Sequence, residues 1–176
     1  DVDVDADIDA TGDVRLATNG DAGDDVELDG DIDAASLVLD GGAAGIVDVN
    51  TAQNNQTGST TIESASNLGA NVTALSDLTA NGDATLSAAV VLTSTNGSID
   101  LNANVIGATN NLTLTANDGT VFAQQLGNTT DVGALDINAD AAELNGDIDA
   151  ASVDTTGVGL TTLTAGTVDI DTAGGT

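Results

Sequence analysis

Hydrophobic and polar residues alternate along most of this chain, in short runs separated by turns that contain Gly and Asn. The first ten residues, DVDVDADIDA, alternate strictly, which is the period of a strand with one buried and one exposed face. Farther on, apolar–polar–apolar triplets such as Val26-Glu27-Leu28 and Val47-Asp48-Val49 recur every ten to twelve residues. Dipeptides such as Asn19-Gly20 fall between them, where turns are needed. The pattern predicts an all-β chain of many short strands.

One unit of this pattern recurs. The heptapeptide Gly-Asp-Ile-Asp-Ala-Ala-Ser stands at 30–36 and again, letter for letter, at 146–152, and a looser copy of the unit at 26–40 lies at 99–115. Apolar positions are kept between the copies, whereas polar positions vary among Asp, Asn and Thr. A stacked repeat is expected to keep its inside and vary its outside. The alignment places Val26 on Ile99, Leu28 on Leu101, Ile32 on Val105, and Leu37 and Leu39 on Leu112 and Leu114.

Short strands at this spacing could form a sandwich, a barrel or a solenoid. The internal repeat favours the solenoid, and so does a composition with one Phe and no Trp or Tyr, because a two-sheet core usually contains aromatic side chains. A small residue (Gly30, Ala103 or Gly146) also aligns between the large apolar positions, as expected where a coil turns a corner. We therefore predict a parallel β-solenoid, a right-handed β-helix of about eight coils of roughly 20–24 residues.

The predicted solenoid covers residues 1–176 as a single segment of a longer rod. Its least regular part is 51–80, because Thr51–Thr61 (TAQNNQTGSTT) has no apolar residue large enough to anchor a coil. We expect a less regular stretch or a loop excursion there.

Charge narrows the range of partners. The chain has 29 acidic residues and one cation, a net charge of −28. This balance argues against nucleic acids and anionic membranes, whose phosphates are bound by Lys and Arg. No apolar run approaches the length of a membrane span, and the absence of Cys excludes disulfides. Cations, high salt or a basic partner are the expected surroundings.

Two runs, GDVRLATNGDAGDDVELDGDIDAASLVLD and GSIDLNANVIGATNNLTLTANDG, resemble the repeats of very large bacterial surface proteins of the filamentous-haemagglutinin type. The resemblance covers most of the chain, less clearly 51–80, and its motifs are compositional. It implies a right-handed parallel β-helix, export by two-partner or autotransporter-like secretion, and a role in adhesion or surface structure. We therefore expect a non-enzymatic structural shaft of a bacterial adhesin or filament, on the cell surface or in the extracellular space.

Rows of carboxylates are the candidate chemistry of this chain. Acidic residues at alternate positions of an extended strand share one face. Stacked coils would bring such carboxylates to within ~5 Å of one another, where each exposed pair repels by roughly 1 kcal/mol. Hard cations, Ca²⁺ above all, would relieve this repulsion. The predicted Ca²⁺ ligands are Glu27, Asp29, Asp31, Asp33, Asp147 and Asp149.

The alternative to specific calcium sites is an acidic, solvated surface that keeps the protein soluble. Known calcium motifs are incomplete: Ala34 stands where an EF-hand loop needs Gly, and Asp40 stands where its bidentate Glu belongs. No cofactor other than Ca²⁺ is expected.

Composition disfavours catalysis. The chain has no His, Lys, Tyr, Trp or Cys, so the usual general bases and the aromatic sugar platforms of polysaccharide-cleaving β-helices are missing. Paired carboxylates could hydrolyse glycosides, but every Asp has a plainer interpretation on a solvated strand face or turn. An ice-binding Thr ladder is also disfavoured, because Thr113-x-Thr115 does not recur at the same place in every coil.

Three functions stay open at this point. The first is the shaft, whose partners are neighbouring coils of the same long chain. The second is a calcium-binding adhesive module that contacts a cell-surface or matrix ligand through its acidic faces or through residues 51–61. The third is a self-assembling extracellular fibre or surface-layer subunit, since an uncapped solenoid end is a strand edge ready to pair.

Overall fold

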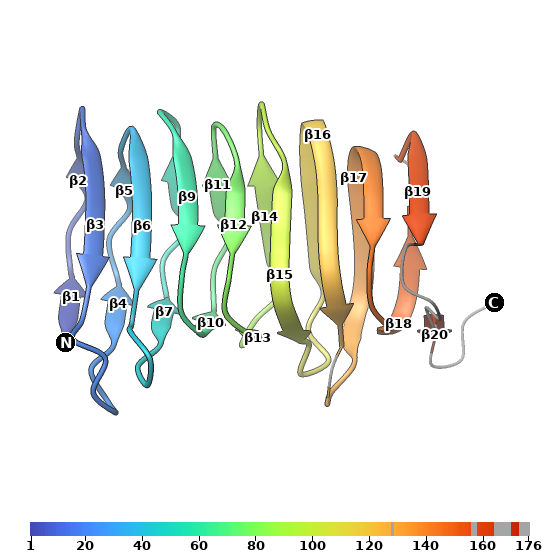
Figure 1. The fold of residues 1–176 in the computed structure, drawn as a ribbon, viewed down its shortest axis with the longest axis horizontal. Coiled ribbons are helices and arrows are strands. Elements are labelled where there is room, and N and C mark those ends of the chain that lie inside the picture. Colours follow the sequence, from blue (N-terminus) through green and yellow to red (C-terminus); the bar gives the residue numbers. More distant parts are fainter. Residues whose placement is uncertain (128, 156–157, 164–169, 173–176) are drawn as a thin grey trace.

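The chain folds as a β-solenoid. The computed structural model describes residues 1–127, 129–155, 158–163 and 170–172. The regular secondary structure within these residues consists of β-strands alone. The strands stack in parallel into about seven turns, close to the eight expected (Figure 1). In Figure 1 the chain rises at the back, crosses over the top and descends at the front as it advances from the N-terminal end, which is a right-handed winding. The predicted fold is confirmed. No helix that could cross a membrane occurs in the part of the chain described.

Each of the first five coils contributes one strand to each of three faces. Coil one is made of β1–β3, coil two of β4–β6, coil three of β7–β9, coil four of β10–β12, and coil five begins at β13. The first face contains β1 (Val2–Val4), β4 (Val26–Leu28), β7 (Val47–Val49), β10 (Ser66–Leu68) and β13 (Ala84–Leu86). The second contains β2 (Ile8–Asp9), β5 (Ile32–Asp33), β8 (Gln53–Asn55), β11 (Val72–Ala74) and β14 (Val90–Ser94). The third contains β3 (Asp13–Ala17), β6 (Ser36–Asp40), β9 (Ser59–Ile62), β12 (Leu78–Ala80) and β15 (Ile99–Ile106).

From the fifth coil onward, longer strands bend around the corners and continue from one face to the next. The third face lies at the front of Figure 1, and its corner with the second face runs along the top. The remaining strands are β16 (Leu112–Leu126), β17 (Val132–Leu144), β18 (Ile148–Asp154), β19 (Leu160–Leu163) and β20 (Ile170–Thr172).

The coils differ in length, and the strand registers show where. On the first face, Val2 pairs with Val26, whereas Ser66 pairs with Ala84, a clearly shorter step along the chain. On the third face, the step from Thr60 to its partner Leu78 is again the short one. Coil four is therefore shorter than predicted, and its short corners leave it recessed between its neighbours.

A single apolar core runs along the axis. Side chains at alternate strand positions point inward, as in β4, where Val26 and Leu28 are fully buried and Glu27 is exposed. The core consists of Val, Leu, Ile and Ala, and each coil covers the inward side chains of the next. This arrangement suits a chain almost without aromatic residues, because small aliphatic side chains fill a narrow prism without voids.

The two letter-for-letter copies of the repeat lie on different faces. Ile32 of the first copy pairs with Ile8 on the second face, whereas Ile148 of the second copy pairs with Leu126 and so continues the first face. The looser copy is displaced in the same way, since Ile99 pairs with Leu78 on the third face. The sequence alignment therefore does not match structurally equivalent positions. The repeated unit is a strand–corner–strand segment, which fits any face because all three require the same alternation.

The stretch 51–80, where we expected irregularity or a loop excursion, forms β8 to β12 within coils three and four. Its apolar pattern fails because polar side chains take inward positions. Gln53, Asn55 and Thr60 are all buried.

Candidate functional site

Acidic residues are concentrated at the N-terminal end of the solenoid. Fifteen of the 29 lie in residues 1–50, and only four lie in 51–110. On the first face, Asp3, Glu27 and Asp48 stack in three successive coils, at outward positions. The N-terminal coils therefore carry the strongest negative potential, whereas the outer surface of the middle coils is mostly uncharged.

The six predicted calcium ligands do not lie as the sequence pattern suggested. Strand β4 ends at Leu28 and a corner follows, so Glu27 lies on the first face and Asp33 on the second. The premise that the four acidic residues between 27 and 33 share one strand is therefore wrong. Asp147 and Asp149 lie six coils away, just before and within β18.

Of the six, Asp29 belongs to a cluster of three acids. One carboxylate oxygen from each of Asp3, Asp5 and Asp29 lies within 4.8 Å of the others, and all three residues are exposed. This is the only such acidic triad among the described residues. Three carboxylate oxygens at this spacing are the kind of ligand set that Ca²⁺ accepts.

The stacking of the second face is interrupted between β5 and β8. Strand β5 pairs with β2 and strand β8 with β11, but the described residues show no ladder between β5 and β8. In a continuous parallel ladder the N–H groups of β5 would donate to backbone carbonyls of β8. Here the N–H of Ile32 donates to Gln53 Oε1 and that of Ala34 donates to Asn55 Oδ1, each at 3.2 Å. We call this interruption the seam.

Asp31 and Asp33 complete the seam on its outer side. The backbone N–H of Asn54 donates to Asp31 Oδ1 at 2.7 Å. The N–H groups of Gln56 and Thr57 both donate to Asp33 Oδ1 at 3.0 Å. Two of the predicted calcium ligands therefore have a structural role, because their carboxylates replace backbone acceptors that coil two would otherwise offer to coil three.

Inside the solenoid, Gln53 and Asn55 satisfy the rest of the seam. Gln53 Nε2 donates to the carbonyl of Gly30 at 2.8 Å, and Asn55 Nδ2 donates to the carbonyl of Ser59 at 2.9 Å. Sequence reasoning missed both residues as structural elements. Their spacing could have revealed them, because Gln53 and Asn55 occupy the alternate, inward positions of β8 that apolar residues occupy in neighbouring strands.

Asp and Asn side chains also tie coils together at many corners. The carboxylate of Asp25 accepts the N–H of Ile46 at 2.8 Å, and that of Asp77 accepts the N–H of Ser98 at 2.9 Å. Asn111 Oδ1 accepts the N–H of Ala134 at 2.8 Å in the same way. Each acceptor stands directly before a strand, and each donor belongs to the following coil. Short Asp and Asn side chains reach such nearby backbone groups, which accounts for the rarity of Glu in this acidic chain.

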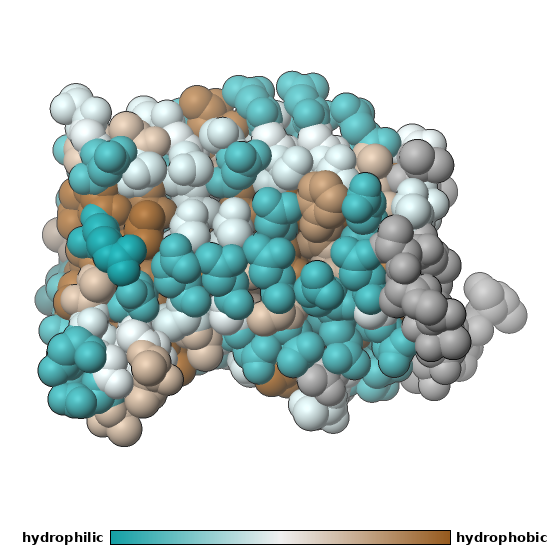
Figure 2. Space-filling view, in the orientation of Figure 1, coloured by the Kyte–Doolittle hydropathy of each residue, from teal (hydrophilic) through white to brown (hydrophobic). Residues whose placement is uncertain are grey.

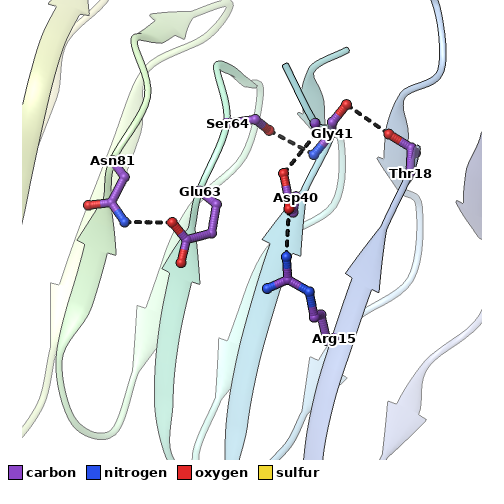
Figure 3. Close-up of polar contacts among 8 residues, drawn as sticks. Arg15, Thr18, Asp40, Gly41, Glu63, Ser64 and Asn81 are labelled. Carbon is purple, nitrogen blue, oxygen red and sulfur yellow. Dashed lines mark hydrogen bonds and ion pairs between the residues drawn. The ribbon is translucent and has the colours of Figure 1, made fainter. Parts of the chain in front are cut away.

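On the third face, polar side chains pair across neighbouring coils toward the C-terminal ends of the strands (Figure 3). The one cationic side chain, Arg15, places Nη2 at 2.6 Å from Asp40 Oδ2. Farther along, Asn81 Nδ2 donates to Glu63 Oε2 at 2.8 Å, and Asn102 Nδ2 donates to Asn81 Oδ1 at 3.0 Å. These contacts join outward positions of adjacent coils and stiffen the stack.

Asp100 is an acid whose pKa is shifted by its surroundings. It lies at an outward, half-buried position of β15. Burial raises the pKa of the Asp100 carboxyl above its ordinary value, and repulsion by the nearby Asp77 carboxylate raises it further. The charged form of Asp100 is therefore disfavoured in the folded chain.

A hollow of about 300 Å³ opens at the corner between the second and third faces. Coil three supplies one wall, the recessed coil four supplies the floor, and coil five supplies the opposite wall. We call this hollow the notch, and its lining residues are Asn54, Asn55, Gln56, Thr73, Leu75 and Thr95. A smaller hollow of about 180 Å³ lies farther along the same edge and is lined by Ala116, Asn117, Asn138, Ala139 and Asp140.

Comparison with known proteins gives no match to a family model, to a curated protein or to a solved structure.

Proposed function

We propose that this chain is a structural shaft segment of a bacterial adhesin or filament of the filamentous-haemagglutinin type, displayed on the cell surface or secreted. The observation that carries the proposal is the continuous apolar core, which extends along the solenoid from Val4 to Ala150. With coils ~4.8 Å apart, seven turns make a rod of roughly 34 Å. A longer array of such coils would span distance in proportion to its length, which is the mechanical task of a shaft.

The surface chemistry supports a shaft rather than an enzyme. The chain has no His, Lys, Cys or Tyr, and its acids are largely engaged in corner bonds or exposed to solvent. Inter-coil contacts such as Arg15–Asp40 resist sliding of one coil past the next. A side-chain network of this kind adds stiffness without forming a reaction centre.

Two experiments test the proposal. Antibodies raised against the chain should label intact, non-permeabilised cells of the source organism or its secreted filaments. Optical-tweezer pulling between residues 1 and 155 should show stepwise release of coils, since each coil contacts only its neighbours. Labelling that requires permeabilised cells would overturn the proposed location. Smooth extension at low force would overturn the mechanical role.

The acidic triad favours a second candidate function, a calcium-binding adhesive module. Asp3, Asp5 and Asp29 bring three carboxylates together at the end of the solenoid where negative charge is densest. A bound Ca²⁺ would join coil one to coil two and lower their mutual repulsion. Isothermal titration calorimetry with CaCl₂ in the presence of excess NaCl would detect a specific site, and heat that vanishes at high NaCl would exclude one.

Self-assembly into a fibre is favoured by a third observation. Within the described residues, strands β1, β2 and β3 pair with β4, β5 and β6, and their other edge can accept a further coil, whether of the same chain or of a second copy. Their apolar side chains Val2, Ile8, Val14 and Leu16 are only partly buried, and Figure 2 shows hydrophobic atoms gathered at this end of the front surface. Sedimentation velocity over a range of protein and salt concentrations would show end-to-end oligomers if copies pair there. A monomer throughout would exclude this function.

A further inference from the structure

We propose that the notch is a binding site for a neutral oligosaccharide. The proposal goes beyond the shaft function and does not rest on it, because a shaft needs no ligand. It rests on three properties of the notch, namely its shape, the chemistry of its lining and the rigidity of one wall.

The shape of the notch follows from the lengths of the coils. The step along the chain from Thr60 to its partner Leu78 is shorter than the next step on the third face, from Leu78 to Ile99. In Figure 1 the corner between β11 and β12 accordingly lies lower than the corners on either side. The resulting hollow of about 300 Å³ is at the lower end of the range for small-molecule sites. It can hold one or two sugar rings of a chain that continues into solvent.

The lining offers uncharged hydrogen-bonding groups and one apolar surface. The side chains of Asn54, Gln56, Thr73 and Thr95 have no hydrogen-bond partner within the described part of the chain. Together they supply two carboxamides and two hydroxyls, each of which both donates and accepts. Leu75 is half-buried on the floor. Sugar rings present the complementary surface, with alternating hydroxyl donors and acceptors at the rim and C–H groups on the ring face.

Charge selects a neutral ligand. No acidic or basic residue lines the notch, and the middle coils are the least acidic part of the chain. A uronic acid would be repelled by a molecule of net charge −28 and would find no cation to pair with. A polyamine would be drawn to the N-terminal coils, where Asp3, Glu27 and Asp48 stack.

The seam holds one wall of the notch rigid. Asn55, which lies between the two exposed amides, is fully buried, and its side chain bonds to Ala34, Ser59 and Thr60. The backbone N–H groups of Asn54 and Gln56 are fixed to the carboxylates of coil two. Coil three is thus the coil that replaces core aliphatic residues with a buried amide network, and the same coil presents the two amides. A wall fixed before binding loses little entropy when a ligand arrives.

The test is a titration of the full 176-residue chain, labelled with ¹⁵N, followed by two-dimensional NMR. The neutral probes are cellotetraose, mannotetraose and chitotetraose, and the charged probes are tetragalacturonate and spermidine. We expect at least one neutral tetrasaccharide at millimolar concentration to shift the amide signals of 54–56, 73–75 and 95. Neither charged probe should shift them comparably.

Variants locate the site. The double substitution Gln56→Ala with Thr73→Ala removes two exposed side chains of the notch and should weaken binding about tenfold, the effect of losing two neutral hydrogen bonds. The matched control is Thr113→Ala with Gln124→Ala, which removes the same side-chain types from outward positions of β16. The control should bind as the unaltered chain does. Asn54→Ala is a second notch variant, and the dispersion of the spectrum verifies that each variant is folded.

Three outcomes would overturn the proposal. The first is the absence of shifts with every neutral probe. The second is shifts confined to the N-terminal coils, or equal affinity in the notch and control variants. The third is tighter binding of tetragalacturonate or spermidine at the notch, which would show that the ligand is not neutral.

Discussion

Asn55 is the residue whose replacement most directly tests the seam. Its side chain is fully buried in β8, where neighbouring coils place Ala34 and Ala74 at the corner position of the same face. Alanine would thus restore the apolar pattern and would suit the core by volume. If the buried amide were only a tolerated irregularity, Asn55→Ala would be neutral or stabilising.

The structure indicates a large loss instead. Without Asn55 Oδ1, the N–H of Ala34 and that of Gly58 lose their acceptor, and both residues are buried. Each unsatisfied buried N–H costs about 1–3 kcal/mol. The carbonyl of Ser59 also loses its donor, but this residue is half-exposed, so water can replace the bond. We expect Asn55→Ala to lower the free energy of unfolding by about 3 kcal/mol.

The assay is urea unfolding followed by far-UV circular dichroism, with hydrogen exchange at the Ala34 amide as a local readout. The control is Asn54→Ala, which makes the same change one residue earlier, on the exposed side of the strand, where the side chain has no partner among the described residues. It should change stability by less than about 0.5 kcal/mol. If the two variants lose equal stability, or if exchange at Ala34 stays slow in Asn55→Ala, the backbone ladder between β5 and β8 re-forms and the reasoning is refuted.

Three further predictions concern charge, calcium and a corner. The pKa of Asp100 is raised in the folded state, so this carboxyl favours the folded state at low pH, and the contribution is lost as pH rises through the raised pKa. Asp100→Asn should therefore raise the melting temperature at pH 7 and leave it unchanged at about pH 3. An equal rise at both pH values would contradict this. Millimolar CaCl₂ should raise the melting temperature of the unaltered chain above its value in EGTA with matched NaCl. Asp29→Asn should abolish that gain, whereas Asp48→Asn, which lies outside the triad, should keep it. An equal gain from NaCl alone would indicate simple screening of the negative charge. Gly30→Ala should lower the free energy of unfolding, measured in urea, by about 1 kcal/mol or more, because the new Cβ would press on the backbone of Ala6. Gly12→Ala, which has open space around it, should not lower it. Equal effects of the two variants would show that the corner at Gly30 can relax.

The acidic composition was interpreted correctly as a surface property, but its detailed role depended on the structure. Sequence reasoning placed Asp31 and Asp33 among the calcium ligands because they alternate with apolar residues. The structure shows them accepting backbone N–H groups of coil three. That role requires β8 to lie beside β5 at one particular register. The local pattern within 26–40 does not indicate which residues of the next coil will lie beside Asp31 and Asp33.

By itself the sequence determined that the chain is a parallel β-solenoid with an aliphatic core and an acidic exterior. Alternation with period two and corner residues such as Gly30 are local properties, and they suffice to specify a strand and a bend. Only the tertiary structure decided which face each strand occupies, as the two identical heptapeptides at 30–36 and 146–152 show by lying on different faces. It also decided that Gln53 and Asn55 point inward, against the usual cost of burying amides. The physical reason is the same in both cases. The three faces require the same alternation of apolar and polar residues, so the lengths of the intervening corners set how the strands stack. The stacking then determines which backbone groups lack a partner and which side chains replace that partner.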